Sequence, residues 1–454
     1  MQSISVRNVV TAGAAALLAL ASSSAEAVPS YARQTGQACV ACHVSFPELT
    51  PYGRWFKLSG YTIGVRQDIP LAGMAIGGIT SIKNNDDGTG TGTLATARNN
   101  LPAFNQASIF LAGKATDNIG GFVQYTYAQT YNTDGTGSGH SGIDNTDLRV
   151  VGRMGNLAAD DVKLLYGLTL HNNPTAQDVW NSTPAFGFPF TTSPTAIAPT
   201  AGTQIEGALG QQVAGLGAYV FYDRTWYAEL TGYRTADGVF SVLRHGQDTG
   251  SPGSVARLQG GNPYVRFAYN KEWGAQSMMV GAFAMRVKRY LDNTDPTSGT
   301  DRYTDRGLDA QYQYIANRHT VTAQARYIVE RQDHRTSFAQ GLTANTDDRL
   351  RSAQLKATYY FEHRYGVTLS HFAIRGTADP VLYPSGAVTG SANGKPDSRG
   401  AILEFDYLPV QNVRLLTQYT RYSTFNGGRN GYDGVTSRSP RDNNTLFFDV
   451  WVAY

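Results

Sequence analysis

Residues 163–171 read KLLYGLTLH. At alternate positions of this segment lie the apolar residues Leu164, Tyr166, Leu168 and Leu170. Between them lie Leu165, Gly167, Thr169 and His171. Because successive side chains of a β-strand point to opposite faces, this alternation predicts a strand with one apolar face.

The same period of two recurs after residue 70, in about sixteen segments of roughly ten residues or more. The segments begin near Leu71, Gln106, Ile119, Ile143, Asp161, Ala208, Thr225, Pro263, Ala275, Asp301, Asn317, Asp348, Arg364, Ser398, Gln411 and Asn443. Single-chain bacterial outer-membrane barrels have an even number of antiparallel strands. None of these segments has the run of about 20 apolar residues that a membrane-spanning helix needs.

The connections between the predicted strands alternate in length. Short turns lie at Thr116-Asp117-Asn118, Asp223-Arg224, Trp273-Gly274, Ala316-Asn317, Glu362-His363 and Pro409-Val410. Long polar loops lie at 83–105, 131–142, 172–206, 236–261, 289–300, 333–347, 377–397 and 425–442. Short periplasmic turns and long outer loops are typical of bacterial barrels. Residues 71–454 are therefore predicted to form an all-β, about 16-stranded antiparallel outer-membrane β-barrel, with both ends of the chain on the periplasmic side.

The C-terminal segment and the composition agree with this prediction. LFFDVWVAY at 446–454 has one apolar face and ends in an aromatic residue, which resembles the C-terminal strand that outer-membrane assembly machinery recognises. The chain holds 27 Tyr, a residue suited to membrane interfaces, and 49 Gly, suited to turns and bends. A net charge of +3 without any basic block does not indicate a nucleic-acid partner. A secreted β-sandwich or propeller is the alternative fold.

The first 27 residues are predicted to be a cleaved secretory signal peptide. Arg7 precedes an apolar run from Val9 to Ala21, and Ala25-Glu26-Ala27 supplies small residues where a signal peptidase cuts. The alternative is an N-terminal anchor, but the run is shorter than the about 20 residues that span a bilayer. Export is expected to place the mature chain in the bacterial cell outer membrane.

Both cysteines of the chain lie in one pentapeptide, Cys39-Val40-Ala41-Cys42-His43. This spacing is the c-type haem attachment motif, in which two thiols add across two porphyrin vinyl groups and the adjacent histidine reaches the iron. A thioredoxin-like redox pair, a structural disulfide and a zinc site are the alternatives. Cys39 and Cys42 are predicted to attach one haem c covalently, and His43 is predicted to be its proximal iron ligand.

Residues 28–70 are predicted to form a small monohaem cytochrome c segment. A helix is expected across about 47–59, closed by Gly60. Arg54 and Lys57 could pair with the haem propionates. Flat apolar faces to cover a macrocycle are offered by Phe46, Tyr52, Trp55, Phe56 and Tyr61.

The second iron ligand is left open between two residues. Met74 stands at the start of the first predicted strand, and a methionine at some distance from the motif is a common sixth ligand of cytochromes c. The alternative is that Met74 is an ordinary strand residue. His171 is the next candidate, because the alternation points it into the barrel. The loop 172–206 is rich in aromatic and proline residues, so we expect it to fold inward, where it would narrow the pore or cap the haem; contact with lipopolysaccharide or a neighbouring subunit is the alternative.

Two stretches, ARQTGQACVACHVSFPELTPYGRWFKLSGYT at 32–62 and NNPTAQDVWNSTPAFGFP at 172–189, resemble the fused outer-membrane monohaem cytochrome–porins of iron-oxidising bacteria. With the barrel, the resemblance covers essentially the whole mature chain. It implies uptake of electrons from extracellular Fe(II) or another donor, through the haem, to a periplasmic cytochrome or other carrier. The activity so implied is Fe(II) oxidation.

Two other functions fit the same residues. One is a porin for small solutes, in which the haem is a structural or sensory group. The other is a conduit that exports electrons to extracellular acceptors. The sequence does not identify the electron donor, the direction of flow or the periplasmic partner.

Overall fold

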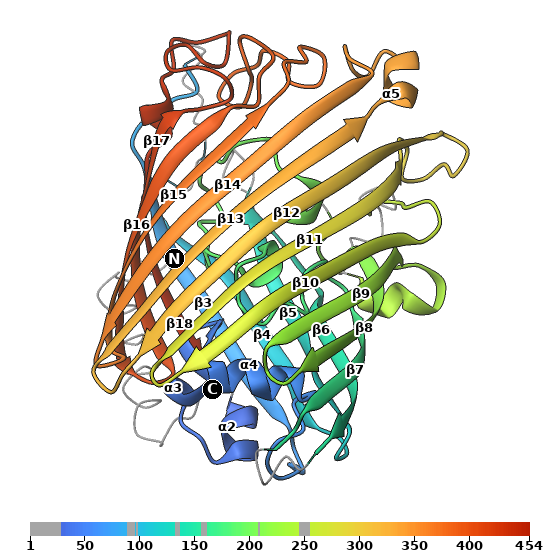
Figure 1. Ribbon diagram of the computed structural model, residues 1–454. Coiled ribbons are helices and arrows are strands. Elements are labelled where there is room, and N and C mark those ends of the chain that lie inside the picture. The colour runs from blue at the N-terminus through green and yellow to red at the C-terminus, as the bar shows by residue number, and fades with distance from the viewer. Residues whose placement is uncertain are drawn as a thin grey trace, which may run out of the picture.

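The computed structural model describes residues 29–88, 96, 99–131, 137–155, 161–207, 209–244 and 255–454. Its main feature is a closed barrel of sixteen strands, β3 to β18, in which every strand pairs with its neighbours in the chain and β18 pairs with β3 (Figure 1). All of these pairings are antiparallel. The chain thus forms a closed, 16-stranded antiparallel β-barrel, as predicted. The signal-peptide prediction for residues 1–27 lies outside the described residues.

The barrel strands are β3 Leu71–Ile82, β4 Pro102–Lys114, β5 Ile119–Tyr131, β6 Gly137–Met154, β7 Leu164–His171, β8 Val213–Tyr222, β9 Trp226–Thr235, β10 Asn262–Trp273, β11 Gln276–Tyr290, β12 Thr300–Ile315, β13 His319–Asp333, β14 Asp347–Phe361, β15 Tyr365–Gly376, β16 Ser398–Val410, β17 Val413–Thr424 and β18 Thr445–Ala453. Helices and short strands outside the barrel wall are α2 Pro29–Thr35, α3 Cys39–Cys42, β1 His43–Ser45, β2 Glu48–Leu49, α4 Pro51–Leu58, η1 Pro184–Phe186, η2 Gln204–Glu206, η3 Gly238–Leu243, α5 Arg335–Ala339 and η5 Pro440–Asn443. None of the helices in the described part of the chain is long and apolar enough to cross a membrane.

The alternation seen in the sequence separates the two faces of the wall. In β7, Tyr166 and Leu168 are 47% and 56% exposed, whereas Leu165 and Thr169 are buried. In β18, Leu446 and Phe448 are exposed, whereas Phe447 and Asp449 are buried. An apolar outer face and a mixed inner face are what a barrel in lipid requires, because the outer side chains contact acyl chains.

The short turns and the long connections lie at opposite ends of the barrel, as predicted (Figure 1). The short turns lie at one end together with the C-terminus and helices α2 to α4, and the long connections that carry α5 and η5 lie at the other. One expected loop is shorter than predicted: β6 begins at Gly137, so part of 131–142 is strand. Its glycines and polar residues pair with Gln129 to Tyr131 of β5, since backbone hydrogen bonds need no apolar side chain.

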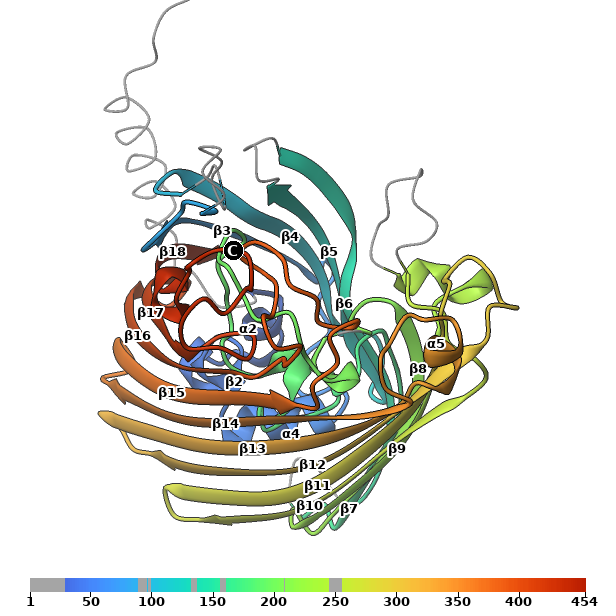
Figure 2. The same ribbon diagram turned by 90° about the horizontal axis from the view of Figure 1, so that it is seen from above.

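Two segments enter the barrel (Figure 2). The first is the N-terminal segment, residues 29–64. The second is the loop 172–206, in which Trp180 is only 1% exposed and its indole N–H donates to Asn270 of β10 at 3.2 Å. The prediction that this loop folds inward is therefore confirmed.

The helix of the N-terminal segment is shorter than predicted. It begins at Pro51 rather than near residue 47, because Thr50 caps it by accepting a hydrogen bond from the Gly53 N–H at 3.1 Å. Residues Glu48–Leu49 instead form the short strand β2. The expected end is confirmed: Gly60 has φ +68°, and the Tyr61 N–H donates to the carbonyl of Phe56 at 3.1 Å.

Candidate haem-binding site

The cysteine motif forms one turn of helix, α3, followed by an extended residue. The His43 N–H closes the turn on the Cys39 carbonyl, and His43 itself has φ −125° and ψ 136°. Cys39 is buried and Cys42 is half-buried, and no disulfide joins them. Three positions apart on a helical turn, the two side chains lie on one side, which is the arrangement needed to reach two substituents of one flat ring.

The electrostatics of Cys42 differ from those of a redox dithiol. Burial, followed by the neighbouring Cys39, raises the pKa of the Cys42 thiol to about 12. Reactive cysteines of thioredoxin-like motifs have lowered pKa values, because cationic groups or a helix N-terminus stabilise the thiolate. The surroundings of Cys42 therefore disfavour the redox-pair interpretation of the motif.

Helix α4 holds the cysteine turn in place through Thr50 and Gly53. The Thr50 N–H donates to the Cys42 carbonyl at 2.9 Å, and its hydroxyl donates to the Ala41 carbonyl at 2.5 Å. A Cβ on Gly53 would lie 2.2 Å from the Cys42 carbonyl oxygen. Only glycine allows this approach, because a methyl group there would overlap with backbone that cannot move aside.

Gly53→Ala is therefore expected to separate α4 from the cysteine turn. Forced overpacking of this kind costs about 1–3 kcal/mol, so the unfolding midpoint should fall and the α3–α4 segment should be cut faster by protease. Both are measured on the purified barrel by urea titration and limited proteolysis. Gly232→Ala is the matched control, because no atom lies within 4 Å of a Cβ built there. Equal protease resistance of the two variants would contradict the assigned role of Gly53.

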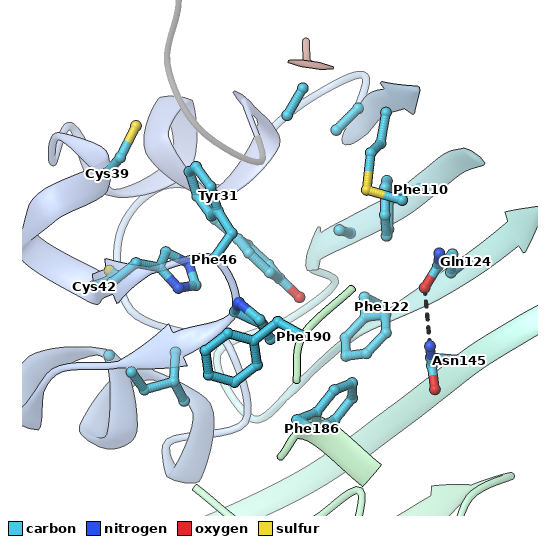
Figure 3. A pocket seen from close by; sticks show the side chains of 18 of the residues that line it. Tyr31, Cys39, Cys42, Phe46, Phe110, Phe122, Gln124, Asn145, Phe186 and Phe190 are labelled. Atoms are coloured by element: carbon cyan, nitrogen blue, oxygen red, sulfur yellow. Dashed lines mark hydrogen bonds between the residues drawn. The ribbon is translucent and has the colours of Figure 1, made fainter. Parts of the chain in front are cut away.

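A cavity of about 500 Å³ lies beside the cysteine turn, inside the barrel. Its volume falls in the range typical of cofactor sites. In Figure 3, Cys39 and Cys42 lie on one side of the view and Phe110, Gln124 and Asn145 on the other. The aromatic residues that line the cavity are Tyr31, Phe46, Phe56, Tyr61, Phe110, Phe122, Phe186, Phe190 and Trp451.

Several of these rings are held in fixed positions. Tyr31 stacks on Tyr61 with ring centroids 5.3 Å apart, and the Tyr61 hydroxyl donates to Asp147 at 2.6 Å. Phe46 lies between His43 and Trp451, with centroid distances of 5.1 Å and 6.1 Å. These rings offer flat apolar surface, which suits a macrocycle, whereas polar side chains such as Gln124 and Asn145 line other parts of the cavity.

His43 is at the edge of the cavity in the state that a metal ligand needs. Burial lowers the pKa of its imidazole to about 4, so the ring is neutral at neutral pH. Its Nδ1 atom is buried and makes no hydrogen bond of good geometry within the described residues, although the backbone of Pro47 and Glu48 lies close enough to the ring to oppose the fall in pKa. A neutral imidazole coordinates metals, and a buried nitrogen without a partner is costly unless something satisfies it. The residues present therefore fit a group that carries a metal ion.

The two candidates for the second ligand have different surroundings. Met74 of β3 lines the same cavity as His43. His171 does not line it. The Nε2 atom of His171 shares a 2.8 Å hydrogen bond with the Tyr233 hydroxyl, and its Nδ1 lies 3.2 Å from the Thr169 hydroxyl. His171 points into the barrel as predicted, but both ring nitrogens are engaged away from the cavity, so it is not a ligand candidate in this structure.

The expected propionate partners need one correction. Lys57 lines the cavity, where its ammonium donates to the Ala176 carbonyl at 2.5 Å. Arg54 does not line it: its guanidinium donates to Gln313 at 2.6 Å and lies 3.5 Å from Glu272. Arg54 is rotated by about 100° from Gly53, which turns its side chain to the flank of α4 and toward the wall strands, although Lys57 is only about 60° away. Arg54 thus ties the helix to the barrel wall.

The expected aromatic cover needs the same correction. Phe46, Phe56 and Tyr61 line the cavity, as predicted. Tyr52 and Trp55 lie on the Arg54 side of the helix and line a second, smaller cavity. There the Arg224 guanidinium lies 4.3 Å from the Trp55 ring centroid. The helix is therefore two-sided, with one face toward the first cavity and one toward the wall.

The inward loop supplies the far wall of the cavity. Pro184, Phe186 and Phe190 line it. The loop is anchored at Asp178, whose carboxylate accepts from the Thr183 N–H at 3.0 Å and lies 3.6 Å from the Arg266 guanidinium. The sequence predicts that this loop narrows the pore or caps the haem, and its position inside the barrel and across the cavity from the cysteine turn is compatible with both roles.

Four aromatic wall residues were not predicted from the sequence: Tyr31, Phe110, Phe122 and Trp451. The last three stand at inward positions of β4, β5 and β18, which in this barrel otherwise carry many polar or small residues. An aromatic side chain on an inward face was the signal that could have identified them. No such signal marked Tyr31, which precedes the motif on α2.

No protein-family model matches the chain, and no curated protein resembles it in sequence. Among solved structures, the loop L8 deletion mutant of OmpT, an outer membrane protein of Vibrio cholerae, is similar at 7% identity, with 85% of this chain and 98% of that chain covered and a TM-score of 0.44. The anion-selective porin from Comamonas acidovorans is similar at 9% identity, with 85% and 98% covered and a TM-score of 0.44. The outer membrane channel DcaP of Acinetobacter baumannii is similar at 13% identity, with 85% and 96% covered and a TM-score of 0.44.

Proposed function

We propose that this protein is an outer-membrane electron conduit with one c-type haem inside its barrel. In this proposal it takes electrons from an extracellular donor, Fe(II), and passes them to a periplasmic cytochrome or other carrier. One observation carries the proposal: the only two cysteines and the adjacent His43 border an aromatic cavity of about 500 Å³ within a closed barrel. The resemblance of residues 32–62 and 172–189 to cytochrome–porins supports the same function.

Each residue has a role in this proposal. Cys39 and Cys42 hold the group by thioether bonds, and His43 and Met74 ligate its iron. The rings of Tyr31, Tyr61 and their neighbours exclude water from its faces. A c-type haem bound there would supply reversible one-electron transfer, whose potential depends on ligands and burial.

The position of the cavity suits delivery to the periplasm. Helices α2 to α4 lie at the end of the barrel that carries the short turns (Figure 1), and in outer-membrane barrels this end faces the periplasm. A periplasmic carrier could therefore approach the cysteine turn closely. The long connections lie at the opposite end, where an extracellular donor would be met.

The direct test is reduction of the purified, detergent-solubilised protein by Fe(II). We expect Fe(II) to produce the spectrum of reduced haem c, and a variant without both cysteines to show no such change. An oxidised spectrum that Fe(II) leaves unchanged, while dithionite reduces it, would overturn the Fe(II) assignment. Reoxidation by extracellular acceptors alone would favour the export direction.

A solute porin in which the haem is structural or sensory is the second candidate. The barrel architecture favours it, because inward positions carry polar residues such as Thr320, Thr322 and Gln324. The filling of the lumen by residues 29–64 and the loop 172–206 argues against a wide pore. Planar bilayer recordings separate the two functions: large, steady ion conductance with a haem that does not exchange electrons supports the porin.

Met74→Ala tests the ligand set. Loss of a thioether ligand should remove the weak near-infrared charge-transfer band of the ferric protein. It should also lower the midpoint potential by at least about 59 mV, a tenfold change in the one-electron equilibrium constant. The control is Met154→Ala, since Met154 is 62% exposed in β6 and does not line the cavity. If the spectrum and potential of both variants match the parent protein, Met74 is an ordinary strand residue.

A further inference from the structure

Six arginines cluster on the outer surface of the barrel, near the end with the long connections. We call this cluster the arginine rim, and it consists of Arg286, Arg302, Arg331, Arg349, Arg351 and Arg375, from strands β11 to β15. All six are exposed. They line a shallow groove of about 780 Å³.

The register of the strands places the rim on the lipid-facing side. Side chains alternate along each strand, so Arg351 shares a face with Leu355, and Arg302 shares a face with Leu308. Leu355 and Leu308 are exposed apolar residues of the outer surface, 59% and 62% exposed. From Leu355 to Arg351 the chain runs four residues, or about 13 Å along the strand. The rim therefore lies just beyond the apolar band.

Aromatic residues mark the opposite edge of this band. Three exposed tyrosines lie near the short turns that join β12 to β13 and β14 to β15: Tyr314, Tyr359 and Tyr365. Outer-membrane barrels carry aromatic girdles at the membrane interfaces, so these residues fix the periplasmic edge. The arginine rim lies at the other edge, at the depth of the outer-leaflet headgroups.

The rim places like charges opposite each other at two positions, whereas Arg302 is opposite Asp333. Arg331 pairs directly with Arg349, and Arg351 pairs directly with Arg375. Like charges directly opposite each other across two strands are destabilising. Among the described residues, no ion pair within 4.0 Å includes any of the six; nearby Asp333 instead pairs with Arg335 at 3.3 Å. Asp333, Asp347 and Asp348 also line the groove, but six guanidinium groups outnumber three carboxylates.

We propose that the arginine rim binds the phosphate groups of lipopolysaccharide in the outer leaflet. The lipid A part of this glycolipid carries phosphates directly above its acyl chains, which is the depth that the rim occupies. Guanidinium groups bind phosphate oxygens through paired hydrogen bonds, and several neighbouring arginines can share one phosphate. The site requires only that the barrel span the outer membrane, so it is independent of the haem.

The test is binding of lipid A to the intact purified protein in detergent micelles, with bisphosphorylated and dephosphorylated lipid A as the two probes. We expect Arg331→Gln/Arg349→Gln to bind the bisphosphorylated form at least tenfold more weakly than the parent, and the parent to prefer that form by a similar factor. Arg351→Gln/Arg375→Gln is the second variant, in case the first does not fold. Heat-modifiable mobility on gels checks the barrel of each.

The matched control removes two positive charges from the other end of the barrel. Lys163→Gln/Arg318→Gln changes exposed residues beside the short turns and should leave lipid A affinity unchanged. Equal affinity of the parent and both rim variants, or equal affinity for the two lipids, would overturn the proposal. Full competition by inorganic phosphate at the same concentration as lipid A would also overturn it, because a free anion would then suffice.

Discussion

Replacing Cys39 and Cys42 together by alanine is expected to remove covalently bound haem completely. The chain has no other thiol, so no thioether to a vinyl group can form once both are gone. Either single substitution leaves one possible thioether, and partial haem staining is expected. The measurement is haem staining of a fully denatured gel, together with the reduced-minus-oxidised absorption spectrum of the same preparation.

Folding of the double variant has to be shown separately. The sixteen-stranded ring involves neither cysteine, so heat-modifiable mobility should persist. A folded barrel without covalent haem is the expected outcome. Haem staining of the double variant at the level of the parent would falsify the attachment assignment. Loss of the protein from the outer-membrane fraction would instead show that the cysteine turn is needed for folding.

Glu48→Ala is expected to produce the largest loss of stability. The Lys356 ammonium of β14 lies 2.5 Å from the Glu48 carboxylate, and both side chains are almost fully buried. Removing one member leaves the other charge buried without its direct partner, which typically costs about 3–5 kcal/mol. The Lys356 ammonium also lies 4.9 Å from the Phe190 ring centroid, so the loss should extend to the cavity wall. Urea unfolding of the barrel measures the effect.

Two further variants separate the pair from its surroundings. Glu48→Gln/Lys356→Met removes both charges and should recover most of the stability, because no buried charge remains. Glu362→Ala breaks the Arg318–Glu362 pair, which is 65% and 45% exposed, and should cost about 0–1 kcal/mol. If Glu48→Ala and Glu362→Ala shift the midpoint equally, the buried pair does not hold the N-terminal segment.

The barrel could be predicted from the sequence because its signal is local. Each strand alternates on its own, as residues 163–171 do, and the number of strands follows from counting. Boundaries were less predictable where polar residues extend a strand, as at Gly137. There the pairing partner in β5, rather than hydrophobicity, determines where β6 begins.

The candidate site could be predicted only in part. The motif Cys39 to His43 is contiguous, so its chemistry can be recognised without a fold. The wall of the cavity combines strands that are distant in the chain, such as Phe122 of β5 and Trp451 of β18. The wrong side for Arg54 has a related cause. Arg54 is only about 60° of helical rotation from Lys57, so spacing does not separate the two, and the residues that hold its guanidinium lie on strands far along the chain.

The closure of the barrel has a consequence for the order of events during biogenesis. Met74 and Ala453 both line the cavity, and they are paired neighbours on β3 and β18, the first and last strands of the ring. The pocket is therefore incomplete in every folding intermediate in which these two strands have not yet met. A group retained only by packing would be lost during that interval. Thioether bonds do not depend on the finished pocket. A covalently attached group would therefore be kept while the barrel closes, whereas a group held only by packing would not.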